Sequence, residues 1–229
     1  MNDEFHMHHG QTYLGYHYKH DVIDTFVSYL QKYPTETIVV LVSTEFRPKN
    51  NTLPFYQVFL NYINEEHKDY WYLNDKLPTL GEVRGKLVLL RRFYSSITPL
   101  GIDMSGWRDS QTFHIQNDSS VKFYIQDEYR SHYTQKWSKF LHLIERSQAN
   151  DDENINSKVW FLNYGSATYW QRLNPPMYIA YQINKLLFDY LKLNSEKLNK
   201  PVGILMLDFV DHKIVRLVCD MNFLTKQFS

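Results

Sequence analysis

The stretch TIVVLVSTE, residues 37–45, contains five consecutive apolar residues, four of them β-branched. β-branched side chains favour strands, and an apolar run without polar alternation is typical of a strand that is buried on both faces. Such strands occur in parallel sheets whose two faces are covered by helices. The run ends in Ser43, Thr44 and Glu45, which would lie at the carboxyl end of the strand. The stretch therefore predicts an α/β fold with a parallel sheet.

Segments with strand and helix patterns alternate on both sides of this run. Ile23, Phe26, Val27 and Leu30 have the spacing of one helical face. Strands are predicted at residues 4–9, 37–45, 86–93, 121–129, 158–165 and 202–210. Helices are predicted at residues 22–33, 55–67, 132–147, 175–192 and 213–224. Because the chain has 229 residues and no linker rich in glycine or serine, we expect a single domain over residues 1–229, with a doubly wound sheet or a closed barrel.

Each predicted strand ends in or near a polar residue that is able to carry chemistry. These residues are His9, Glu45, Arg92, Asp127, Asn163 and Asp208. In a parallel barrel all six converge on the carboxyl-terminal face, where barrel enzymes keep their active sites, whereas a doubly wound sheet spreads them along a line. Six successive polar strand ends favour the barrel. Strand alternation also places His9 on the side of Phe5 and Met7, so we expect its side chain to point inward.

The composition argues against several classes of protein. Lys and Arg together number 25, as do Asp and Glu, so the formal net charge is zero and a nucleic acid partner is not expected. Cys219 is the single cysteine, which excludes an intrachain disulfide, and we expect it to be buried as a small apolar residue. No apolar run approaches the roughly 18 residues of a membrane-spanning helix, so no transmembrane segment is expected.

Six sequence blocks follow one another along the chain. They are HHGQTYL (8–14), KYPTETIVV (32–40), LGEVRGKLVLLRRF (80–93), SGWRDSQTF (105–113), IQDEY (125–129) and FLNYGS (161–166). In this order they resemble the phosphatidylinositol-specific phospholipase C X domain in its bacterial-like, single-domain form, from about His8 to Asp208. The resemblance implies a distorted (β/α) TIM-type barrel. It also implies cleavage of phosphatidylinositol, or of a glycosyl-phosphatidylinositol anchor, to diacylglycerol and a cyclic inositol phosphate, by a protein that is secreted or peripheral at a membrane surface.

The resemblance assigns roles to five residues. His9, directly before a glycine, matches the general acid that protonates the leaving alkoxide. Asp208 matches the carboxylate that orients the second catalytic histidine. Arg92 and Asp127 match residues that hydrogen-bond the inositol hydroxyls, and Tyr129 matches a tyrosine that stacks on the inositol ring.

Four further residues complete the predicted site. Glu45 and Asn163, at strand ends, are predicted to bind substrate. Tyr169 and Trp170 lie in the segment 166–178, which follows a strand and is predicted to form a membrane-dipping rim; packing against the next helix is the alternative. No cofactor is expected, although calcium stays an open alternative because eukaryotic relatives hold calcium with a glutamate near Glu45.

The histidine-rich start of the chain is not expected to hold a metal. Strand alternation separates His9 from His6 and His8, and two histidines two residues apart form a weak site without a third ligand.

The chain departs from the family pattern at its start. The family's general base and a phosphate-binding arginine lie upstream of the block that here begins at His8. Five strand-to-strand steps of about 40 residues each span His9 to Asp208, so a closed eight-stranded barrel would lack two strands. We therefore expect an N-terminally truncated chain that lacks its first two strands and has weak or no activity.

Two other function classes stay open. A non-catalytic pseudoenzyme module would bind the lipid headgroup without turnover. A glycerophosphodiester phosphodiesterase is also a barrel that uses histidines, but it would need a metal-binding His–Glu pair. The single Glu–His dipeptide, Glu66–His67, lies in a predicted surface helix.

Overall fold

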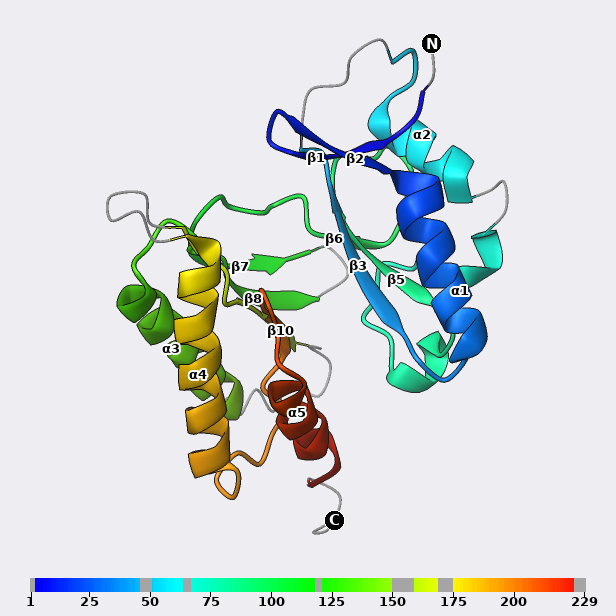
Figure 1. Ribbon diagram of the computed structural model, residues 1–229. Helices are drawn as coiled ribbons and strands as arrows, with labels where there is room; N and C mark the ends of the chain where they lie inside the picture. Colours follow the sequence, from blue (N-terminus) through cyan, green and yellow to red (C-terminus); the bar gives the residue numbers. More distant parts are fainter. Residues whose placement is uncertain are drawn as a thin grey trace. The chain divides into compact units, whose positions relative to one another are not determined.

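The computed structural model describes residues 3–45, 51–63, 67–117, 121–149, 159–168 and 175–224 (Figure 1). Contacts between Cα atoms divide the chain into two compact units, Met1–Trp107 and Arg108–Ser229. Each unit contains its own four-stranded sheet and its own helices, and the first unit also contains a two-stranded hairpin. The expectation of a single domain over residues 1–229 stays a prediction.

The four-stranded sheet of the first unit is parallel throughout. Its strands are β3 (Ile38–Ser43), β4 (Trp71–Tyr72), β5 (Leu87–Arg92) and β6 (Ile102–Asp103). β5 pairs with β3 along one edge, and with β4 and then β6 along the other. β3 and β5 pair without a shift from Ile38 opposite Leu87 to Ser43 opposite Arg92, so the two strands end side by side.

The two-sided burial that the sequence predicts for residues 37–45 occurs in β5 instead. Leu87 through Leu90 are each at most 1% exposed. In β3 only Val42 is buried, and Val39 is 39% exposed. Position in the sheet explains the difference, because β5 has neighbours on both edges, whereas β3 pairs with β5 alone within the described residues. The predicted strand and its parallel pairing are confirmed, but the expectation of two buried faces is wrong.

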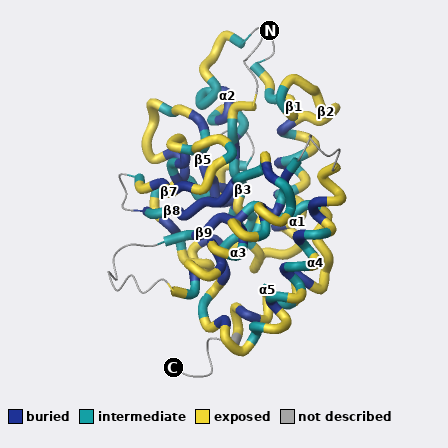
Figure 2. The backbone as a smooth tube through the Cα atoms, turned by 90° about the vertical axis from the view of Figure 1, so that its left-hand side faces the viewer, coloured by how far each residue is buried: buried dark blue, intermediate teal, exposed yellow. Residues whose placement is uncertain are grey.

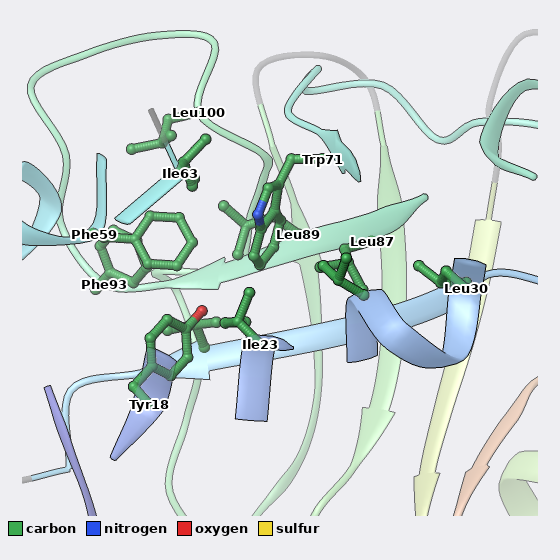
Figure 3. Packing of buried hydrophobic residues seen from close by; sticks show 12 residues of the cluster. Tyr18, Ile23, Leu30, Phe59, Ile63, Trp71, Leu87, Leu89, Phe93 and Leu100 are labelled. Atoms are coloured by element: carbon green, nitrogen blue, oxygen red, sulfur yellow. The ribbon is translucent and has the colours of Figure 1, made fainter. Parts of the chain in front are cut away.

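Helices pack on one face of this sheet. Their buried side chains and those of the sheet together form the core of the first unit. The helices are α1 (Asp24–Lys32), which follows a π-helical turn (Tyr18–Ile23), and α2 (Phe55–Tyr62). Val27 and Leu30 of α1 and Phe59 of α2 belong to the same buried cluster as Leu87 and Leu89 of β5 (Figure 3). The helix predicted at residues 22–33 thus buries the face that its apolar spacing indicates.

The N-terminal stretch forms an antiparallel hairpin. Its strands are β1 (His6–His9) and β2 (Thr12–His17). Gly10 and Gln11 make the two-residue turn, and Gly10 has a φ of +57°, in the left-handed region that glycine adopts without strain. Phe5 anchors the hairpin, because its ring stacks on Phe55 with centroids 4.3 Å apart and its backbone N–H donates to the Tyr62 hydroxyl (2.8 Å). The strand predicted at residues 4–9 is present, but its partner is β2 and not a parallel strand.

The sheet of the second unit is mixed, in the order β10–β9–β8–β7. Its strands are β7 (Thr112–Gln116), β8 (Lys122–Gln126), β9 (Val159–Tyr164) and β10 (Ile204–Met206). β8, β9 and β10 are parallel, and β7 is antiparallel to β8. β7 is absent from the strands predicted above, although Phe113 and Ile115 alternate with exposed neighbours as in a strand with one buried face.

Helices cover this second sheet and share one core with the segment before β10. They are α3 (Tyr133–Ala149), α4 (Pro176–Asn194) and α5 (His212–Leu224). The core contains Phe140, Ile144, Leu187, Leu191, Leu198, Val202, Ile214 and Met221. Buried stretches of the chain are dark blue in Figure 2. β10 is shorter and less buried than the strand predicted at residues 202–210, because within the described residues it pairs with β9 alone. None of the helices in the described ranges is long and apolar enough to cross a membrane.

The orientation of α5 decides the environment of Cys219. Ile214, Leu217, Val218 and Met221 pack into the core at helical spacing. Cys219 lies outside this face and is exposed. The expectation that Cys219 is buried is therefore wrong.

Candidate active site

Three predicted site residues, His9, Glu45 and Arg92, lie at one end of the first unit. β3 and β5 end together at Ser43 and Arg92, and Glu45 follows two residues after Ser43. The Glu45 carboxylate accepts a hydrogen bond from the backbone N–H of Gly10, with 3.0 Å between Oε1 and N. The residue after His9 is thereby tied to the carboxyl end of β3.

The side chain of His9 is exposed, so the expectation that it points inward is wrong. Phe5 and Met7 pack against the core, as alternation predicts. A register shift between His6 and His8 then breaks the alternation of β1 against β2 before His9 is reached. His9 therefore stands beside the tight turn of the hairpin, where its imidazole is accessible from solvent.

Arg91, the residue before the predicted site residue Arg92, is a structural ion-pair partner. Its guanidinium is buried, with Nη2 2.7 Å from Asp103 Oδ2, and its Nε donates to the Leu100 carbonyl (3.0 Å). Partial burial raises the pKa of Asp103, but hydrogen bonds from Ser105 and the charge of Arg91 outweigh it and hold that pKa below its ordinary value. The ion pair between Arg91 and Asp103 thus links β5 to β6.

Arg92 points to the other side of the strand and is half-buried. Its guanidinium lies over the indole ring of Trp107, 4.8 Å from the ring centroid, which is a cation–π contact. Trp107 was not among the predicted site residues, although it belongs to the block SGWRDSQTF. The contact places the guanidinium fork at the carboxyl end of β5; its predicted hydrogen bonds to inositol stay a prediction.

The second unit contains a buried polar network, and only some of its members are predicted site residues. Lys136 of α3 is 0% exposed, and its ammonium donates to Gln126 Oε1 (2.9 Å) and to the backbone carbonyl of Glu128 (3.3 Å). Gln126 donates to Asn163 Oδ1 (2.9 Å), and Asn163 donates to the Phe140 carbonyl (2.8 Å). The amide oxygen and nitrogen of Asn163 both have partners inside the unit. Its contact with substrate stays a prediction.

Lys136 also lies near two of the predicted site carboxylates. Burial lowers the pKa of its ammonium to about 8, and the negative charges of Asp127, Glu128 and Asp208 oppose this shift. Asp127 follows β8 directly and Asp208 follows β10 by two residues, so the charges that act on Lys136 come from two strand ends. The substrate-binding role of Asp127 and the orienting role of Asp208 stay predictions.

The sequence does carry a signal for Lys136. It lies on the buried face of α3 with Phe140, Leu143 and Ser147, at intervals of four, three and four residues. Lysine is almost never fully buried unless it is paired. A lysine at a core position of the helix that follows the block IQDEY therefore indicates a buried charge near that block.

Tyr129 belongs to an exposed charged cluster of the second unit. Its hydroxyl donates to Asp109 Oδ1 (2.8 Å) and accepts from Arg130 Nη2 (3.1 Å), and the Arg130 guanidinium lies over its ring, 5.2 Å from the centroid. Partial burial, together with the hydrogen bond to Asp109, raises the pKa of Tyr129. Stacking of Tyr129 on inositol stays a prediction. The two residues of the predicted membrane rim, Tyr169 and Trp170, lie outside the described residues.

Comparison with known proteins gives a consistent result. The chain is 28% identical over 215 residues to the 1-phosphatidylinositol phosphodiesterase of Staphylococcus aureus, a match that covers 90% of this chain and 67% of that protein. It is 29% identical over 227 residues to the protein of the same name from Listeria monocytogenes, covering 96% and 65%. No family model matches. The chain thus spans about two thirds of the length of the curated relatives that it matches.

Solved structures of the phosphatidylinositol-specific phospholipase C of S. aureus are also similar. A double mutant of that enzyme matches with a TM-score of 0.83 and 26% identity, over 96% of this chain and 75% of the other. A single mutant matches with a TM-score of 0.83 and 25% identity, over 96% and 74%. The fold is accordingly α/β, of the distorted (β/α) TIM-barrel type, although within the described residues neither sheet closes on itself. By sequence and by fold, this chain is therefore similar to the bacterial phosphatidylinositol-specific phospholipases C.

Proposed function

We propose that this chain acts in the cleavage of phosphatidylinositol at a membrane surface. The observation that carries the proposal is the match, over 90% or more of the chain, to two proteins named 1-phosphatidylinositol phosphodiesterase. A glycosyl-phosphatidylinositol anchor presents the same inositol phosphodiester and is the alternative substrate. A secreted protein, or one peripheral to a membrane, would meet either lipid.

In the proposed reaction the inositol 2-hydroxyl loses its proton to a base and attacks phosphorus, and the bond from phosphorus to the glycerol oxygen breaks. The leaving alkoxide takes a proton from His9, so the products are diacylglycerol and a cyclic inositol phosphate. The exposure of His9 and the hydrogen bond from Gly10 to Glu45 support this role, because they present the imidazole on a fastened turn. The family resemblance assigns the base to a histidine upstream of the block that here begins at His8, and it assigns the orientation of that histidine to Asp208.

Three side chains are proposed to recognise the inositol ring. Arg92 is proposed to donate to two neighbouring hydroxyls with its guanidinium fork, and Asp127 to accept from others. Tyr129 supplies a ring face for stacking. Lys136 is a positioning residue in this scheme, because its buried ammonium attracts the carboxylates of Asp127 and Asp208.

Phosphorus NMR on vesicles tests the proposal. Purified chain is incubated with vesicles of phosphatidylinositol and phosphatidylcholine, with the S. aureus relative as positive control. We expect slow formation of a cyclic inositol phosphate that is lost in His9→Ala and kept in Asp189→Asn, an exposed aspartate of α4. Insensitivity to the chelator EGTA is expected, and a requirement for calcium would favour the calcium-dependent alternative.

The rival functions give different outcomes in the same experiment. Vesicle binding that depends on Arg92 without any turnover, in a chain that is folded, supports a headgroup-binding module. Metal-dependent hydrolysis of glycerophosphoinositol, with phosphatidylinositol left intact, supports a glycerophosphodiester phosphodiesterase. Either result would contradict the proposed phospholipase activity.

A further inference from the structure

The β1–β2 hairpin carries a second cluster of chemically active side chains, next to the turn that holds His9. Glu4, His6 and His17 each offer one ligand atom, and these three atoms all lie within 4.8 Å of one another. All three residues are exposed. They are absent from the site residues discussed above, and the phospholipase reaction gives them no role.

Strand geometry explains why the three side chains converge. Glu4 and His6 are two residues apart in an extended segment, so both project from the same side of it. His6 is the direct cross-strand partner of His17 in the antiparallel register, and their ring centroids are 4.6 Å apart. The ladder continues beyond this pair, because the backbone N–H of Tyr18 donates to the Phe5 carbonyl (3.0 Å). The three side chains therefore share one face of one paired ribbon.

The backbone that carries this cluster is held by the core of the first unit. Phe5, between Glu4 and His6, projects to the opposite side and stacks on Phe55, and its N–H donates to the Tyr62 hydroxyl. The N–H of His17 donates to Asp21 Oδ2 (2.6 Å). The backbone of both strands is thus held in place next to the ligand residues. Less conformational entropy is therefore lost when the three side chains come together on an ion.

The donor set favours a transition metal such as zinc over calcium or magnesium. Two imidazoles and one carboxylate are the protein ligands of zinc sites that keep a fourth position for water, whereas calcium and magnesium prefer oxygen ligands alone. Ligand atoms bound to one tetrahedral zinc at about 2.0–2.1 Å lie roughly 3.4 Å apart. The side chains have to close the remaining separation by about 1.4 Å at most, which exposed side chains achieve by rotation about their χ angles.

We propose that Glu4, His6 and His17 bind one zinc ion across the open end of the hairpin. The ion joins the start of β1 to the end of β2 and so restrains the ribbon whose turn carries His9. This site differs from a cluster of His6, His8 and His9, because its third ligand comes from the opposite strand. The inference does not depend on the phospholipase activity.

Zinc binding to the untagged chain tests the proposal directly. Zinc is titrated by calorimetry and, separately, in competition with a chromogenic chelator; cobalt replaces zinc for visible spectroscopy. We expect one ion per chain and cobalt absorption typical of tetrahedral coordination. Each of His6→Ala, His17→Ala and Glu4→Gln should weaken zinc binding by about 10-fold or more, since each removes one of three ligands.

Matched controls make the result decisive. His212→Ala removes an exposed histidine of the second unit beside Asp211 and should leave zinc affinity unchanged. His8→Ala should also have little effect. An unaltered circular dichroism spectrum shows that each variant is folded, which the exposure of the three ligands leads us to expect. The proposal is overturned if His17→Ala binds zinc as tightly as the parent chain, or if His8→Ala is as damaging as His6→Ala, because the histidine run itself would then be the ligand.

Discussion

The Glu45 carboxylate and the backbone N–H of Gly10 are joined by a 3.0 Å hydrogen bond across 35 positions of the sequence. The bond connects the carboxyl end of β3 to the turn that follows His9. A carboxylate acceptor makes a stronger hydrogen bond than a neutral one, so Glu45 fixes the turn more firmly than an amide at the same place would. Glu45 thus acts on the position of His9, whatever contact it makes with substrate.

We predict that Glu45→Gln lowers phosphatidylinositol turnover by about 10-fold, because the charged acceptor for the Gly10 amide is lost and His9 is less well placed. The free energy of unfolding should change by less than about 1 kcal/mol, since Glu45 is exposed. Initial rates and urea unfolding measure the two effects. Glu36→Gln, at another exposed glutamate, is the control and should alter neither.

The neighbouring residues Arg91 and Arg92 should separate stability from recognition. Arg91→Met leaves the Leu100 carbonyl and the Asp103 carboxylate without the guanidinium, and we expect the free energy of unfolding to fall by about 1–3 kcal/mol. Arg92→Met should lower the free energy of unfolding by less than about 1 kcal/mol. The same variant should abolish measurable binding of myo-inositol in saturation-transfer NMR. Equal loss of stability in both variants would contradict the assignment of Arg92 to the site.

His9 should matter most when the leaving group is a poor one. In a chain that also carries the family's general base, His9→Ala is expected to slow cleavage of phosphatidylinositol by about 10²–10⁴-fold, because an alkoxide needs protonation as it leaves. A nitrophenolate leaving group needs little protonation, so the cleavage rate of a substrate that carries one should fall much less. Rates on the two substrates give the comparison, with His8→Ala as the control. Equal losses on both substrates would indicate a binding or structural role for His9.

The buried Lys136 predicts a dependence of stability on alkaline pH. Its pKa is about 8 in the folded chain and about 10.4 in an unfolded chain, so between these values the unfolded state binds more protons. The free energy of unfolding should therefore rise with pH from about 8 to about 10.4, by on the order of 3 kcal/mol, as the cost of a buried charge is relieved.

Lys136→Met isolates this effect, because the variant has the same remaining titratable groups but no buried ammonium. Urea unfolding of both proteins at several pH values between 7 and 10 measures the difference between their curves. The parent chain should gain stability relative to the variant across this window. Curves that stay parallel would mean that Lys136 does not titrate there.

The elements of the fold are largely predictable from the sequence, but the place of each strand in its sheet is not. Residues 37–45 and 86–93 are both apolar runs, and only pairing reveals that β5 is central and β3 lies at an edge of the described sheet. The short alternating strand β7 lies in a segment between stronger patterns and carries only two buried residues, Phe113 and Ile115. Periodicity over five residues is too weak a signal to separate a strand from a loop.

The candidate site shows a similar limit. Strand ends identify Glu45 and Arg92 as neighbours, because β3 and β5 are parallel and end side by side. His9 joins them by a different route, through the hairpin turn whose Gly10 N–H donates to Glu45. This reasoning from strand ends does not find Lys136, because the residue lies on a helix and not at a strand end. A lysine in a helix is normally expected on the side that faces solvent. The same reasoning does not find His17, since a cross-strand partner depends on the register of a hairpin that residues 4–9 alone do not specify.

The pairing of β3 with β5 makes the length of each strand part of the chemistry. Because the two strands run in step from Ile38 opposite Leu87 to Ser43 opposite Arg92, removing one residue from β3 would withdraw its end by about 3.3 Å and turn the following side chains to the opposite face. Glu45 would then no longer accept the hydrogen bond from the Gly10 N–H of the hairpin. Insertions and deletions that preserve function are consequently confined to the connections, and a loop grafted onto this end of the sheet has to begin after Glu45.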